Sequence, residues 1–305
     1  MKRFTLKIQM SLGILISIGL IWIQPMIDPY FASIVSFVGI NILLALSLMI
    51  ITGMTGQFSL GHAASMAIGA YVSAAITIHL FPHVPTAGPL LFVVALAMGG
   101  GAAILGGLVV GIPSLRLSGD YLAITTLGFG EVVRVVIQNM DEVGGARGLT
   151  GIPHFTNWGW IFGAVVLTLY AITAVTRSTY GRSFFAIRDD EIAARSLGIR
   201  PFIVKLQGFI LGSFIAGIAG GLYAHEVMYI VPSQFGFMKS IEILVMVIIG
   251  GLGHIWGCVA AATGLTILPE FLRPIAEFRM IIYAAILIGV TIWQPARFLQ
   301  KWRRS

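Results

Sequence analysis

The sequence predicts an all-α protein, a polytopic transmembrane helical bundle that forms a single domain over residues 1–305. Of its residues, 57% are hydrophobic and only 10% are charged, against about 25% charged in soluble domains. The apolar runs are long and do not alternate with polar residues, which favours membrane-spanning helices over a β-barrel. The net charge of +7 comes from Lys and Arg gathered in short loops, a pattern that sets membrane topology.

The same sequence excludes several classes of protein. The single cysteine, Cys258, excludes an internal disulfide. No Cys/His group has metal-site spacing, and no Gly-Lys-Ser/Thr loop is present to hold phosphates. We therefore expect no metal, no cofactor, no catalytic residue and no ATP hydrolysis in this chain. The basic residues serve topology, so we expect no nucleic-acid partner.

Two apolar segments precede the first irregular stretch. Lys2, Arg3 and Lys7 come before an apolar run that ends near residue 23, which we interpret as an uncleaved span with its N-terminus inside. A second run covers about residues 31–52.

A glycine-rich break follows at residues 53–62 and carries Thr55, Gln57, Ser59 and His62. Two interpretations stay open. Irregular polar backbone at membrane depth survives only inside protein or beside a wet cavity, as in the broken helices of transporters. Alternatively, the segment is a tight cytoplasmic turn in which Ser59 caps the next helix.

Small side chains recur every four residues in three predicted spans. This spacing places them on one ridge of each helix and lets neighbouring helices approach closely, so we predict a densely packed bundle. The three sets are Gly61, Ser65, Gly69, Ser73 and Thr77; Gly99, Ala103, Gly107 and Gly111; Gly208, Gly212, Ala216 and Gly220.

The middle of the chain predicts a span at residues 90–111, a cytoplasmic turn at 113–116 and a further span from about residue 119. That span carries Glu131 and Arg134, which share a helix face because they are three residues apart. Charged groups within a span are costly and are functional candidates. The alternative is a self-neutralising pair near the membrane interface.

The second half alternates spans and loops. The expected elements are an external loop at 139–157, a span at 158–175, a cytoplasmic loop at 177–203, a span at 204–224, an external segment at 226–238, an apolar run at 241–249, a second glycine break at 250–257, an apolar run at 258–268 and a last span at 280–293. The count is about ten membrane segments with both N and C termini cytoplasmic. A re-entrant segment at either break would change it.

The centre of the cytoplasmic loop is the most charged run in the chain and predicts a short helix over residues 190–198. Asp190 and Glu191 suit its N-terminus, Arg195 its last turn, and Gly198 its left-handed stop. Glu191 and Arg195 are four residues apart with the acid first, the better order for a helical pair.

A helix this short is marginal alone in water, so something must hold it. Phe185, Ile192 and Ile199 recur every seven residues and predict an apolar ridge. A groove on a cytosolic partner would receive such a ridge. The alternative is a solvated loop packed on its own membrane domain.

The residues around Ala193 and Ala194 resemble the Glu-Ala-Ala…Gly loop of ABC-importer permeases, with Ile192 where that loop has Ala. Other stretches resemble the branched-chain amino acid ABC permeases of the LivM type, and they occur in family order over about residues 30–295. These stretches are GQFSLGHAA from Gly56, YLAITTLGFGEVVR from Tyr121, GLTGIP from Gly148 and GGLGHIWG from Gly250.

The resemblance implies a role that composition and spacing do not. Such a chain is a permease subunit of an ATP-driven importer for branched-chain or other hydrophobic amino acids in a bacterial inner membrane. It pairs with a homologous second permease subunit and an extracytoplasmic substrate-binding protein. Two cytoplasmic ATPase subunits hold ATP and Mg. The loop 177–203 would couple to them through Phe185, Arg188, Asp190, Glu191, Ile192, Ala193, Ala194, Arg195, Gly198 and Ile199.

A zwitterionic substrate needs polar groups for its ends and apolar walls for its side chain. For this pathway we nominate Thr55, Gln57, Ser59, His62, Thr125, Thr126 and Glu131. Three alternatives stay open. The family also holds urea and short-amide permeases. An ion-coupled secondary transporter would use buried charges such as Glu131. An intramembrane enzyme would need a third group beside Ser59 and His62.

Overall fold

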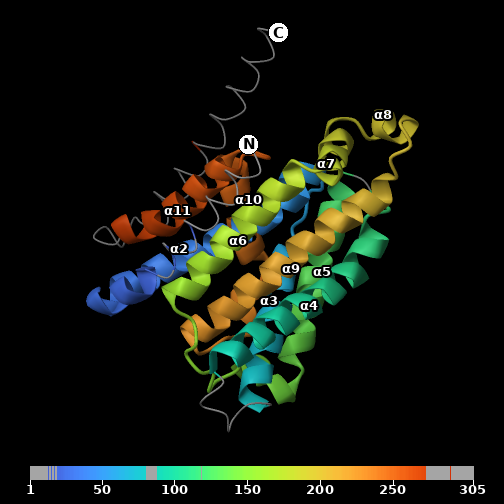
Figure 1. The fold of residues 1–305 in the computed structure, drawn as a ribbon. Coiled ribbons are helices and arrows are strands. Elements are labelled where there is room, and N and C mark those ends of the chain that lie inside the picture. The colour runs from blue at the N-terminus through green and yellow to red at the C-terminus, as the bar shows by residue number, and fades with distance from the viewer. Residues whose placement is uncertain are drawn as a thin grey trace.

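The structure is a computed structural model and describes residues 13, 15, 17, 19–79, 88–117, 119–272 and 289. Within these residues the chain is helical, apart from loops and one isolated β-bridge between Leu149 and Ile230. The helices lie side by side in an elongated bundle (Figure 1). The predicted all-α class is confirmed.

Six of the described helices are long and apolar enough to cross a membrane by length and composition, which agrees with the predicted multi-pass chain. They are Pro29–Met54 (α2, Pro29–Leu48, extended by the π-helical turn η2, Met49–Met54), α4 (Gly88–Ser114), Tyr121–Gln138 within α5 (Asp120–Gln138), α6 (Trp158–Thr176), α9 (Pro201–Val227), and Pro232–Gly250, which joins η6 (Pro232–Phe235) to α10 (Phe237–Gly250). The shorter apolar helix α11 covers Ile255–Phe271. Two predicted spans, ending near 23 and covering 280–293, lie largely outside the described residues. The count of ten and the sidedness of the termini stay predictions.

Both glycine breaks reach the same end of the bundle. A Cβ added to Gly53 would lie 2.7 Å from the backbone nitrogen of Gly253. Helices α7 (Thr179–Asp189) and α8 (Glu191–Ser196) project from this end, at the upper right of Figure 1. We call it the α8 end.

The centre of the bundle is a close trio formed by α3 (His62–His79), α4 and α9. A Cβ on Gly69 would lie 2.2 Å from the carbonyl oxygen of Gly217, and one on Gly220 would lie 2.0 Å from that of Met66. No side chain fits at either position, so the backbones touch directly. The dense packing predicted from the small-residue spacing is confirmed.

Two helices begin inside the bundle instead of at its ends. The first residue of α3, His62, lies beside Ser47 of α2, with 2.6 Å between the imidazole Nε2 and the serine Oγ. The N–H of Ala63 donates to Ser240 Oγ at 3.1 Å. The first turns of α3 and α10 therefore meet below the bundle surface, and each follows an irregular segment.

Candidate functional site

Helix α8 is closed at both ends by the residues that the sequence predicted. Asp190 Oδ1 accepts two backbone N–H groups of the first turn, at 2.9 and 3.0 Å. At the other end Gly198 is left-handed with φ +83°, and Ile199 N–H donates to the carbonyl of Ala194 at 3.1 Å. These are the features of a Schellman stop. Because an N-cap alone contributes about 1 kcal/mol, the caps offset much of the cost of so short a helix.

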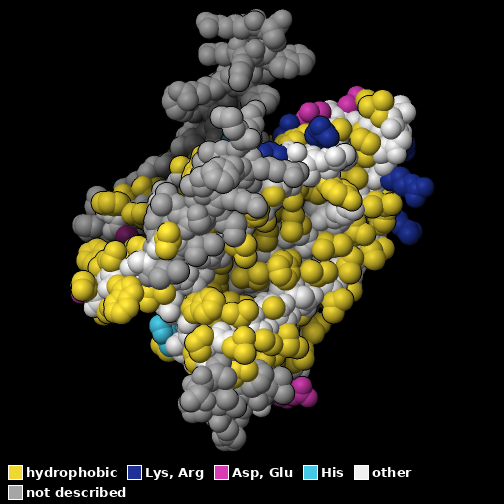
Figure 2. All heavy atoms as spheres, viewed as in Figure 1, with side chains coloured by type: hydrophobic (Ala, Val, Ile, Leu, Met, Phe, Trp, Pro, Cys, Tyr) yellow, Lys and Arg dark blue, Asp and Glu magenta, His cyan; other side chains and the backbone are white. Residues whose placement is uncertain are grey.

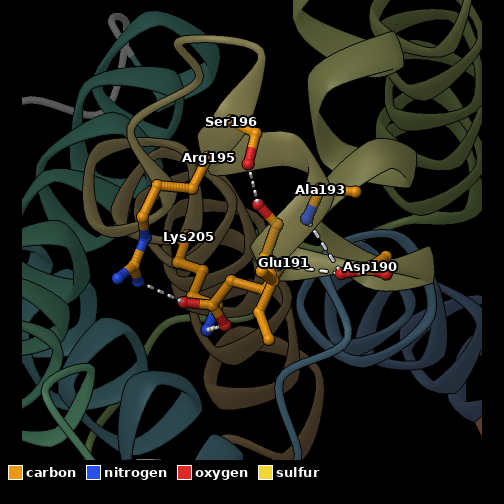
Figure 3. Close-up of polar contacts among 7 residues, drawn as sticks. Asp190, Glu191, Ala193, Arg195, Ser196 and Lys205 are labelled. Carbon is orange, nitrogen blue, oxygen red and sulfur yellow. Dashed lines mark hydrogen bonds and ion pairs between the residues drawn. The ribbon is translucent and has the colours of Figure 1, made fainter.

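Glu191 fastens α8 to the first turns of α9. Its carboxylate accepts from Lys205 Nζ at 2.5 Å and from Arg195 at 3.3 Å, and it lies between the two basic side chains in Figure 3. The predicted pair of Glu191 and Arg195 is present. The contact to Lys205, which links α8 to a membrane helix, was not predicted. Ala193 and Arg195 are exposed, whereas Ala194 is buried against the bundle.

Two large apolar side chains face solvent at α8. Ile192 is 80% exposed and Leu197 is 81% exposed. The predicted ridge is wrong, because Phe185 packs against the core and Ile199 is half-buried. The chain is extended at Asp190, between α7 and α8, so a seven-residue register does not continue across it. The exposed apolar surface therefore consists of Ile192 and Leu197, the C-cap residue, and does not include Phe185 or Ile199.

Helix α7 was not predicted as a separate element. It begins after Ser178, whose hydroxyl accepts a first-turn N–H at 3.2 Å. Near its end Arg188 turns toward the bundle, and its Nη1 donates to the carbonyl of Gly53 at 3.1 Å. The guanidinium also lies 4.9 Å from the centroid of the Phe185 ring. Arg188 therefore joins the loop to the first break.

The first break turns at the α8 end and then re-enters the bundle. Thr55 and Gln57 are buried. The Gln57 amide nitrogen donates to Thr55 Oγ1 at 2.6 Å and to the carbonyl of Lys205 at 2.9 Å. Its amide oxygen, Oε1, is buried and has no hydrogen-bond partner in the part of the chain that the structure describes. A turn at the bundle end is followed by irregular backbone buried in protein, as the first interpretation expected. The cytoplasmic side of this turn stays a prediction.

The re-entrant part leads to the start of α3. Ser59 is buried but lies three residues before His62, so it does not occupy the N-cap position. The backbone N–H of Leu60 donates to Thr126 Oγ1 of α5 at 3.0 Å. Five of the seven nominated pathway residues thus gather along this segment: Thr55, Gln57, Ser59, His62 and Thr126.

The other two nominated residues lie apart from that group. Thr125 donates to the carbonyl of Tyr121 in its own helix at 2.8 Å. Glu131 binds Arg134 at 2.7 Å, and both side chains are about one-third exposed. The geometry is that of the self-neutralising pair.

Sequence reasoning missed a second charged cluster within the bundle. Lys239 Nζ lies 3.1 Å from Glu242 Oε2 and 3.2 Å from Asn41 Oδ1, and the Asn41 amide donates to Thr266 Oγ1 at 2.9 Å. Asn41 lies about 20 Å along the helix from Met54, at 1.5 Å per residue. The signal available was a Lys and a Glu three apart at the edge of an apolar run.

Comparisons with known proteins agree with this architecture. The family model described as "Branched-chain amino acid transport system / permease component" matches residues 30–291. The high-affinity branched-chain amino acid transport system permease protein LivM of Salmonella typhimurium is 33% identical over 98% of this chain and 76% of its own length. The autoinducer 2 import system permease protein LsrC of Salmonella paratyphi B is 31% identical over 44% of this chain and 41% of its own.

A solved structure has the same fold. It is described as a metal-chelate type ABC transporter in an inward-facing conformation, with a TM-score of 0.52 and 16% identity over 95% of this chain and 98% of that one.

Proposed function

This chain belongs to the branched-chain amino acid transport permeases, and from that premise we propose that it lines one half of the membrane path of an importer for branched-chain or other hydrophobic amino acids. Members of the family are ABC transporter permease subunits and not enzymes, as the sequence predicted. The partners we propose are a homologous second permease subunit, two cytoplasmic ATPase subunits and an extracytoplasmic binding protein, in a bacterial inner membrane.

One observation carries the coupling role: a doubly capped helix at the tip of the α8 end exposes two large apolar side chains, Ile192 and Leu197. Apolar residues on a short surface helix suit a groove on a partner. We assign that groove to an ATPase subunit. A movement of the partner would reach α9 through Glu191 and Lys205, and the first break through Arg188 and Gly53.

For the pathway, the first break offers the chemistry that an amino acid needs. Irregular backbone and several polar side chains lie inside the bundle here, and within the described residues Gln57 keeps one buried acceptor without a protein partner. A substrate ammonium would suit that acceptor. Thr125 and Glu131 stay in the proposed pathway as weaker members, because their polar groups already have partners in α5.

The coupling proposal is tested with Ile192→Asp combined with Leu197→Asp in the reconstituted transporter. We expect ATP hydrolysis stimulated by the binding protein to fall at least about tenfold, since two central apolar contacts of a docking surface are lost. Tyr180→Asp is the matched control, because Tyr180 is exposed on α7 at the same end but outside α8. Unchanged stimulation in the double variant would overturn the assignment.

Substrate and energy source are tested separately. Uptake of labelled leucine should be competed by isoleucine and valine, and not by urea or short amides. It should stop when ATP is removed and continue when the proton gradient is collapsed. The opposite pair of results would favour an ion-coupled transporter.

A further inference from the structure

The side of α8 that faces away from Ile192 borders an open pocket of about 640 Å³. Three separate stretches form its walls: residues 115–117 after α4, the inner side and stop of α8, and the first turns of α9. Neither Ile192 nor Leu197 lines it. The pocket is therefore distinct from the apolar tip assigned to the ATPase.

The pocket is strongly basic. Its lining includes Arg116, Arg195, Arg200 and Lys205, but only one acid, Glu191. That acid is already shared by two of the four cations, Lys205 and Arg195. Within the described part of the chain, the side chains of Arg116 and Arg200 are exposed and form no hydrogen bond or ion pair. Two of the arginines that line the pocket thus have no anionic partner among the described residues.

A strip of exposed apolar side chains leads along α4 toward the pocket. Leu105, Val109 and Ile112 are spaced by four and three residues, so they share one helix face, and all three are exposed. Phe202 and Ile203 are exposed at the start of α9. Figure 2 shows a largely hydrophobic flank with Lys and Arg gathered at the α8 end. An apolar strip on a membrane-spanning helix contacts acyl chains, so its end lies at the level of the headgroups.

We propose that this pocket binds the phosphate of an anionic phospholipid. The guanidinium groups of Arg116 and Arg200 suit a phosphodiester because each presents a planar set of donors. An acyl chain of the same molecule would lie along Leu105, Val109 and Ile112. Because Glu191 and Arg195 of α8 form one wall, the bound lipid would also hold α8 against α9. The inference requires that α4 and α9 cross a bilayer, and does not depend on the ATPase assignment.

The test is lipid binding by the full-length subunit, measured by native mass spectrometry in detergent. Phosphatidylglycerol is titrated against phosphatidylcholine, with glycerol 3-phosphate as the soluble phosphate. We expect a preference for phosphatidylglycerol that falls about fivefold for Arg116→Gln or Arg200→Gln alone and about twentyfold for both, the size expected for cations at a bilayer surface. Arg177→Gln is the control, because Arg177 is an exposed arginine at the same end that does not line the pocket.

Three results would overturn the proposal. The first is an unchanged preference in the double variant, or an equal loss in Arg177→Gln. The second is displacement of the lipid by glycerol 3-phosphate at comparable concentration, which would assign the pocket to a soluble phosphate. The third is loss of the preference when the whole transporter is assembled, which would assign the pocket to a protein partner.

Discussion

The two glycine-rich breaks have similar composition and reach the same end of the bundle, yet they fold differently. At the first, seven residues, 55–61, separate the end of the α2 segment from α3, and the chain re-enters the bundle. At the second, α10 ends at Gly250 and α11 begins at Ile255 after a short turn. Glycine content alone therefore does not distinguish a re-entrant segment from a turn.

The residues between the glycines account for the difference. The first break carries Thr55 and Gln57. The Gln57 amide donates to Thr55 Oγ1 and to the carbonyl of Lys205, so irregular backbone is tolerated inside protein. The second break offers mainly glycine backbone. There α10 and α11 approach so closely that a Cβ on Gly257 would lie 1.9 Å from the carbonyl oxygen of Gly250.

Arg188 lies where the two breaks meet. Its Nη1 donates to the carbonyl of Gly53, and a Cβ on Gly253 would lie only 3.0 Å from the same nitrogen. One side chain from α7 therefore contacts both breaks. We expect substitutions at three places to lower stability by decreasing amounts. These are the turn between α10 and α11, the contact of Arg188 with both breaks, and the re-entrant segment of the first break.

The largest effect is expected for Gly257→Val, which should separate α10 from α11. Overpacking typically costs about 1–3 kcal/mol, and here the obstacle is backbone that cannot rotate away, so we expect the upper end of that range. The measurement is the thermal unfolding midpoint of the purified subunit in detergent. The control is Gly264→Val in the same helix, because among the described residues a Cβ there meets nothing within 4 Å. Equal midpoints for the two variants would contradict the close turn.

Arg188→Gln should have a smaller effect on stability and a clear effect on coupling. It removes a charge-assisted hydrogen bond worth about 1.5–3 kcal/mol when fully buried, and less here because the side chain is 31% exposed. If Arg188 transmits movement of α7 to the two glycine breaks, its loss should lower the leucine taken up per ATP hydrolysed while hydrolysis continues. Arg188→Lys should recover part of the ratio.

The control for this junction is Arg182→Gln, since Arg182 is exposed on α7 and its side chain donates to Thr179 of the same helix. A ratio that falls equally in both variants would point to a general loss of charge on the loop. That result would exclude a specific role for Arg188 in transmitting movement from α7 to the two breaks.

The sequence was sufficient for features that depend on neighbouring residues, and insufficient for those that depend on distant ones. The caps of α8 were predictable because Asp190 and Gly198 act on backbone within a few residues. The inward turn of Arg188 was not, because its acceptor is 135 residues away in the chain. The cluster around Lys239 was missed for the same reason, as Asn41 is 198 residues distant. Span positions followed from hydropathy, whereas the internal start of α10 did not.

The smallest loss of stability is expected for Gln57→Leu. This variant distinguishes a packing role of Gln57 from a role in transport. Interhelical hydrogen bonds in membrane proteins average about 0.6 kcal/mol, so losing two donors should cost about 1 kcal/mol. If Gln57 lines the substrate path, leucine uptake at fixed expression should fall severalfold more than this small loss explains. Thr173→Val is the control, because that hydroxyl bonds to the carbonyl of Leu169 in its own helix, α6, and lies outside the proposed pathway. Uptake equal to that of Thr173→Val would make the re-entrant segment a packing element, and the two breaks would then differ in shape but not in role.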